Sequence, residues 1–297
     1  MKKIFYIIAL GVGLAGCSNN EDELLSRGSF PEDHVIRIIT EVNEPLSRAG
    51  YDVTNLERFG LMIRNSENAA YNYHKQMVSS GNAWSTSDGQ QMLWDAERTP
   101  VTMIAYAPYM SEAAPDASLV VNALTNQTTE ENVKSSDFLL MKATVDPEQD
   151  LTADGKLKIS LSHAMSKLLI KITVNGTTDA AMNKLGDMSI NGAVVNGICD
   201  LSATVPIVVP APDAVVATVA PYKGTESCEC ILPPQKIVEG FSVNFSYDGK
   251  LYIWTAKEAI ELEKGVEHTL TLNVNTTVRL AAKMARNWAT GQLIDRN

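Results

Sequence analysis

The 297-residue sequence lacks the patterns of fibrous, coiled-coil and nucleic-acid-binding proteins. It has no three-residue glycine period and no sustained heptad, which excludes collagen-like and coiled-coil chains. Only 25 Lys and Arg residues stand against 35 Asp and Glu, and no basic run exists to bind phosphates. The remaining composition, 45% apolar and 20% charged, is that of a globular chain of one large or two ordinary domains. We expect no nucleic-acid partner.

The sequence is also poor in the motifs of catalysis. It contains no HExxH metal motif, no GxSxG nucleophile elbow and no phosphate-binding P-loop. The four histidines, His34, His74, His163 and His268, show no metal-ligand spacing. We therefore predict a protein that is not an enzyme, with no catalytic residues, no metal site and no cofactor. Glycosidase chemistry stays open, because one sequence does not reveal paired carboxylates across a cleft.

Cysteine is scarce, and its positions point to export. Residues 1–16 begin with two lysines, continue with a short apolar run and end in small residues, as in a secretory signal peptide. The run is too short for a permanent membrane-spanning helix. Leu14-Ala-Gly-Cys17 resembles the lipobox of bacterial lipoproteins, which implies cleavage before Cys17 and lipidation of its thiol, palmitate included. Residues 17–33 are then an acidic tether.

Three cysteines remain in the body of the chain, Cys199, Cys228 and Cys230. Disulfides form in an exported protein, but three thiols leave at least one unpaired. A bridge from Cys199 and three buried thiols are both compatible with the sequence.

The body of the chain has the alternation of β-strands. Residues 241–247, 270–274 and 168–174 alternate apolar and polar side chains, which predicts half-buried strands. Two segments, 179–185 and 279–288, have a mildly helical pattern. Six dipeptides favour tight hairpin turns: Asp88-Gly89, Asp154-Gly155, Asn175-Gly176, Asn191-Gly192, Asn196-Gly197 and Asp248-Gly249. We predict an all-β protein with an N-terminal β-sandwich domain over 34–157 and a C-terminal one over 158–297.

Several segments, in this order, resemble the fimbrillin-like family of type V pilus lipoproteins. After the lipobox they are Val35-Ile-Arg-Ile-Ile-Thr40, Leu46-Ser-Arg48-Ala, Ser136-Asp-Phe-Leu-Leu-Met141, Leu161-Ser-His-Ala-Met-Ser-Lys-Leu168, Gly265-Val-Glu-His-Thr-Leu-Thr-Leu272, and Trp288 followed by Gly291. The resemblance implies two tandem β-sandwich domains of Greek-key, transthyretin-like topology. It also implies a structural shaft or tip subunit that serves cell adhesion, first as an outer membrane lipoprotein and then in a cell-surface pilus.

The resemblance further implies assembly by donor-strand exchange. An arginine-specific protease would cut after Arg48, with Arg27 as the alternative. A cut after Arg48 would release a first strand whose apolar residues are Val35, Ile36, Ile38, Ile39 and Val42. The vacated groove would accept a strand from another pilus subunit, and the finished pilus would contact a receptor on a host or bacterial surface.

The donor strand expected from the resemblance lies in residues 278–297. Val278, Leu280, Ala282 and Met284 alternate as a strand does, whereas Ala281, Ala285 and Trp288 also fit a short helix. A shaft subunit donates this strand, whereas a tip subunit need only accept one. The competing interpretation is a surface glycan-binding lipoprotein, in which Trp84 and Trp94 would be exposed in one plane.

Overall fold

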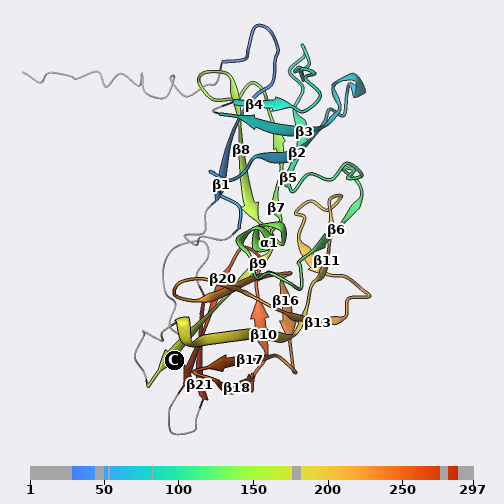
Figure 1. Cartoon of the computed structure of the whole chain (residues 1–297). Coiled ribbons are helices and arrows are strands. Elements are labelled where there is room, and N and C mark those ends of the chain that lie inside the picture. The colour runs from blue at the N-terminus through green and yellow to red at the C-terminus, as the bar shows by residue number, and fades with distance from the viewer. Residues whose placement is uncertain are drawn as a thin grey trace, which may run out of the picture.

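The computed structural model describes residues 29–43, 50–52, 54–81, 83–175 and 182–274, together with the backbone of 280–286. Cys17, Arg27, Arg48 and Val278 lie outside the described residues. Within them almost all of the regular secondary structure is β-strand, which confirms the all-β prediction (Figure 1).

The N-terminal half forms one twisted sheet. In the described residues its strand order is β1 (Arg37–Asn43), β8 (Lys156–His163), β7 (Leu139–Val145), β5 (Val101–Ala107), β2 (Arg58–Arg64), β3 (Tyr73–Ser80) and β4 (Ala83–Thr86). The central strands β2 and β5 bury both faces, so their sequences are continuous apolar runs without alternation. Strand β1 lies at one end of the sheet order and β4 at the other.

The C-terminal half, together with β6 from the N-terminal half, forms four smaller sheets within the described residues. Their strand orders are β13 (Val216–Val219), β10 (Leu185–Val194), β17 (Ser242–Tyr247), β18 (Lys250–Thr255); β12 (Val208–Pro210), β11 (Asn196–Asp200), β6 (Ser118–Asn122); β14 (Tyr222–Lys223), β15 (Cys228–Leu232), β9 (Ser166–Val174), β20 (Glu267–Val274), β21 (Leu280–Arg286); and β16 (Gln235–Ile237), β19 (Ile260–Leu262). Strands β9, β17 and β20 confirm the three strands predicted from alternation.

The two helical predictions are largely wrong. The described part of 279–288 is strand β21, which pairs antiparallel with β20, so the alternative strand pattern is the correct one there. In the described part of 179–185, Met182–Lys184 forms a 3₁₀ turn and β10 begins at Leu185. Helix α1 (Glu130–Ser135) is not among the elements predicted from the sequence. Its signals are the Thr129 side chain, which caps the N-terminus, and two glutamates in the first turn.

The predicted turns divide into two groups. Asp88-Gly89, Asp154-Gly155 and Asp248-Gly249 lie in turns, with glycine φ values of 72°, 73° and 74°. Asn191-Gly192 instead lies inside β10, where the register shifts, and Asn196-Gly197 begins β11. The expectation of a hairpin turn was therefore wrong for these two. The sixth dipeptide, Asn175-Gly176, lies only partly within the described residues, because Gly176 is outside them.

A shared core joins the two halves. Strand β8 stays in the first sheet to His163, so the chain changes sheets between β8 and β9, later than residue 157. One apolar cluster lies on one face of the first sheet, around Phe59 and Leu61. The other cluster combines Ile104 and Tyr106 of that sheet with the cores of the C-terminal sheets. The exact division into domains stays a prediction.

Candidate functional site in the groove of the first strand

Strand β1 is an edge strand held by a long parallel ladder. Its pairing with β8 runs from Arg37 opposite Lys156 to Asn43 opposite Ser162, as Figure 1 shows for the two neighbouring strands. By contrast, β8 pairs with β7 only at its last two residues, His163 and Ser162. The ladder with β1 therefore supplies most of the regular pairing of β8 among the described residues.

Residues before β1 extend this attachment to a second segment. The backbone N–H of Ile36 donates to the carbonyl of Met92 at 2.9 Å, and the N–H of Trp94 donates to the carbonyl of His34 at 2.8 Å. Val35 and Leu93 form an antiparallel bridge between them. The first strand is thus bound on one side by β8 and on the other by residues 92–94.

The inner face of the first strand is apolar with one polar position. Ile36, Ile38 and Val42 are buried, whereas the predicted strand residues Val35 and Ile39 are only half-buried. Thr40 occupies the remaining inward position, between Ile38 and Val42. Its hydroxyl oxygen accepts a hydrogen bond from Nε1 of Trp84 at 3.0 Å. Trp84 lies on β4, so this bond links the two ends of the sheet.

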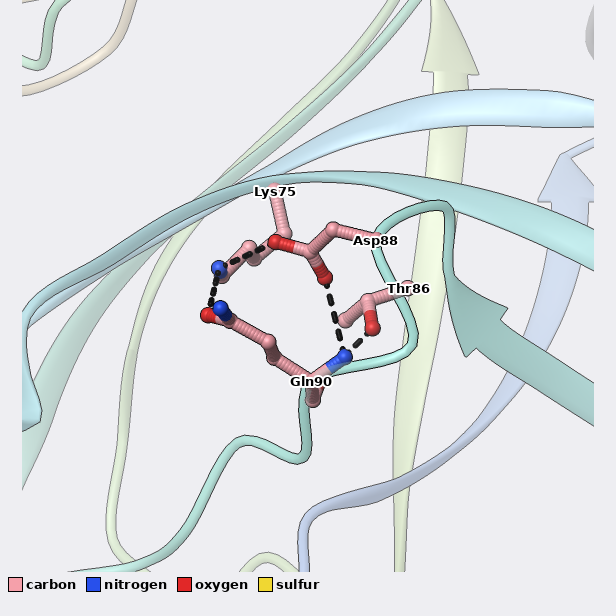
Figure 2. Close-up of polar contacts among 4 residues, drawn as sticks. All are labelled: Lys75, Thr86, Asp88 and Gln90. Carbon is pink, nitrogen blue, oxygen red and sulfur yellow. Dashed lines mark hydrogen bonds and ion pairs between the residues drawn. The ribbon is translucent and has the colours of Figure 1, made fainter.

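A cavity with a volume of about 490 Å3 lies beside the groove that the first strand occupies, between the strand, β4 and the loop that follows β4. Figure 2 shows how that loop is fixed: Lys75 of β3 contacts Asp88 Oδ2 at 2.6 Å and Gln90 Oε1 at 3.0 Å. The Gln90 N–H donates to Asp88 Oδ1, and the Thr86 hydroxyl donates to the Gln90 carbonyl. The hydrogen bond from Lys75 is the main cause that lowers the pKa of Asp88 to about 2.

The outward face of the first strand is polar and charged. The Glu41 carboxylate meets Lys158 Nζ at 2.8 Å and accepts a short hydrogen bond from the Ser160 hydroxyl. These two contacts, that of Lys158 first, lower the pKa of Glu41. Arg37 pairs with Asp33, whose pKa is lowered to about 2 mainly by that hydrogen bond.

The comparisons with known proteins agree with this architecture. The sequence profile described as fimbrillin-like matches residues 47–287. The chain belongs to the fimbrillin-like family. Among curated protein sequences, none matches at a significant level.

Solved structures share the fold of this fimbrillin-like chain. A Bacteroides ovatus protein provisionally assigned to cell adhesion has a TM-score of 0.65 at 16% identity, covering 89% of this chain and 99% of its own. A similar protein from Bacteroides uniformis gives 0.64 at 15% identity, covering 88% and 100%. The tip fimbrial protein Mfa3 of Porphyromonas gingivalis, truncated at its C-terminus, gives 0.50 at 9% identity, covering 85% and 99%.

The chain that follows the predicted cut at Arg48 is fixed independently of β1. The backbone N–H of Tyr51 donates to Asp137 Oδ2 at 3.1 Å, and the same oxygen lies 2.8 Å from Nδ1 of buried His163. The Asn55 amide donates to the Gly50 carbonyl at 2.9 Å. Arg48 thus falls between two attached segments, in a stretch outside the described residues.

The remaining candidate residues behave as core or strand residues. Cys199, Cys228 and Cys230 are free and buried, which agrees with the alternative of three buried thiols and not with a disulfide from Cys199. Burial raises the pKa of Cys199 to about 11 and that of Cys228 to about 12. Leu280, Ala282 and Met284 lie on the backbone of β21. No three His, Cys, Asp or Glu side chains of the described segments lie together as metal ligands.

The tryptophans do not form an exposed plane. Trp94 is only 2% exposed, and Trp84 is half-buried against Phe59, with ring centroids 4.7 Å apart. The expectation attached to glycan binding is therefore not met by this pair. No helix in the described part of the chain has the length and apolar character needed to cross a membrane.

Proposed function

We propose that this chain is a structural subunit of a type V-like pilus that serves cell adhesion. Membership in the fimbrillin-like family supports a pilus role, and the structural likeness to Mfa3 agrees with it. The observation that carries the proposal is the first strand: an edge strand that pairs with β8 along its length, buries Ile36, Ile38 and Val42 in an apolar groove of the body, and is joined to the next described residue by a connection of six residues, 44–49. In this proposal the protein is exported as a lipoprotein whose lipid is attached to the thiol of Cys17.

Removal of the first strand after a cut at Arg48 would open the groove. Ile36, Ile38 and Val42 would lose their burial, at about 1.5–3 kcal/mol for each side chain. The sum is comparable with the roughly 5–15 kcal/mol that holds a typical domain together. Strand β8 would also expose an unpaired edge, which favours addition of a strand from another chain. The cut would therefore act as an assembly switch.

Arg48 suits this switch better than Arg27. A cut after Arg27 leaves the first strand connected to the body, whereas a cut after Arg48 separates it. The contacts of Gly50 and Tyr51 would hold the new end of the chain in place after the cut.

The test uses the mature protein, with Cys17→Ser to avoid the lipid, treated with an arginine-specific protease. Mass spectrometry should identify a cut after Arg48, and the cut protein should lose thermal stability and bind a labelled peptide of residues 33–43. Arg48→Gln is the control, and it should keep both its stability and its closed groove. A cut protein that stays equally stable and binds no strand peptide would contradict donor-strand exchange.

A further inference from the structure

The edge of β8 that faces the first strand is basic. In the ladder between the two strands, Lys156 lies opposite Arg37 and Lys158 lies opposite Ile39. Lys156 is paired with Asp154 just before β8, at 2.6 Å, whereas Lys158 is paired with Glu41 of the first strand. The first strand also carries Asp33, which pairs with its own Arg37. A strand that replaces β1 meets Lys158 without a carboxylate unless it brings its own.

The inner wall of the groove makes a hydrogen bond to one polar position of the first strand, Thr40. Trp84 Nε1 donates to the Thr40 hydroxyl and is held in place by the edge-on contact of its ring with buried Phe59. The neighbouring loop is fixed by the Lys75, Asp88 and Gln90 contacts of Figure 2. A replacing strand with no acceptor at the Thr40 position leaves the half-buried indole N–H facing an apolar side chain, and the lost hydrogen bond weakens binding.

The chain's own C-terminal segment fits the shape of the groove but not its chemistry. Laid in the register of Asp33–Asn43, residues 275–285 place Val278, Leu280 and Met284 at the three buried positions. Ala282 then falls at the Thr40 position and Lys283 at the Glu41 position, where it would face Lys158.

The same register also lacks the counterpart of Asp33. Asn275 takes its place, so Arg279, which would lie opposite Lys156, has no carboxylate four residues before it.

A shift in register does not supply the hydroxyl without a loss elsewhere. The only hydroxyl residue in 278–297 is Thr290. With Thr290 at the Thr40 position in the direction of β1, the buried positions would receive Arg286 and Gln292.

We infer that this groove selects an acidic strand from a different kind of subunit and discriminates against the chain's own C-terminal segment. The selected strand has three apolar side chains on its inner face, a hydroxyl at the Thr40 position and a carboxylate at the Glu41 position. This inference rests on the proposed strand exchange and adds the class of partner. Trp84 and Lys158 are the specificity-determining residues.

The experiment uses the same mature protein, cut after Arg48, and measures binding of fluorescent peptides by anisotropy. The first peptide is residues 33–43 and the second is residues 275–285. We expect the second to bind at least about tenfold more weakly, since one unsatisfied donor and one like-charge contact each weaken binding. Ala282→Thr and Lys283→Glu in the second peptide should together restore most of the affinity.

Salt and two protein variants separate the causes. Rising salt should strengthen binding of the 275–285 peptide relative to the 33–43 peptide, because it screens the repulsion from Lys158. Trp84→Phe keeps an aromatic ring and should abolish the preference for Thr over Ala at the inner position. Lys158→Gln should abolish the preference for Glu over Lys and leave the preference for Thr unchanged.

The outcomes are distinct. Equal affinity of the 33–43 and 275–285 peptides, or discrimination that survives both Trp84→Phe and Lys158→Gln, overturns the inference while strand exchange stands. Failure of the cut protein to bind even the 33–43 peptide overturns the proposed function, and the inference with it.

Discussion

At the scale of single residues, Gly60 shows how closely the first sheet is packed. It lies on β2 beside Tyr106 of β5, and a Cβ atom there would lie 2.6 Å from Cε1 and 2.7 Å from Oη of that ring. The ring has little freedom to move away, because it is fully buried and its hydroxyl donates to the Met110 carbonyl at 2.9 Å. Nε2 of His74 lies 2.8 Å from the same hydroxyl.

Gly60→Ala should therefore destabilise the protein by about 1–3 kcal/mol, the usual range for overpacking. Urea unfolding followed by circular dichroism measures the change. Gly186→Ala is the matched control: its added Cβ would meet first the Ser246 hydroxyl, which lies at the end of a short rotatable side chain. A Gly60→Ala variant as stable as the Gly186→Ala variant would show that the Tyr106 ring moves freely.

Residue-scale features of the groove were only partly predictable from sequence. The first strand and its five apolar residues were expected from the family resemblance. Its sequence does not alternate strictly, so it did not reveal that Ile36, Ile38 and Val42 are the buried ones. The bond from Trp84 to Thr40 joins residues 44 positions apart and leaves no local signal. The same holds for Glu41 and Ser160, which are 119 positions apart.

At the scale of elements, predictability follows how each strand is buried. Strands β17 and β20 alternate strictly, and β9 alternates only in its second half, whereas β2 and β5 bury both faces and show no alternation. Helix α1 has only six residues, too few for a periodic pattern to develop. The parallel pairing of β1 with β8 depends on the course of the whole chain between them, so no local pattern reveals it.

The attachment of β1 to β8 should depend on pH through Glu41. Its pKa is lowered in the folded protein, so its carboxylate stabilises the strand above the ordinary pKa of glutamate, and this contribution is lost as the pH falls through the folded pKa. The melting temperature of Glu41→Gln should therefore lie below that of the wild type at neutral pH. This difference should shrink below about pH 4.

Glu57→Gln is the control for this measurement, because Glu57 is exposed and precedes β2 outside the groove. Its melting temperature should follow that of the wild type at each pH. A Glu41→Gln variant that melts like the wild type at neutral pH would show that the contact with Lys158 does not hold β1.

At the scale of the whole molecule, the two halves are joined by more than their shared core. Lys142 of β7 lies in the N-terminal sheet, and its Nζ donates to the carbonyls of Leu201, Ser202 and Ala203 at 2.7, 3.3 and 2.9 Å. These carbonyls directly follow β11 of the C-terminal half. One ammonium group thus satisfies three acceptors of the other half.

Lys142→Met keeps the length of the side chain but removes its charge and its donors. We expect a loss of about 1–3 kcal/mol, because the carbonyls lose a charged partner where the two halves meet. Lys171→Met, at an exposed position on β9, should change stability by no more than about 0.5 kcal/mol. Hydrogen exchange should further show faster exchange around residues 200–204 in Lys142→Met alone. Unchanged exchange there would mean that the shared apolar core, without the lysine, sets how the two halves are joined.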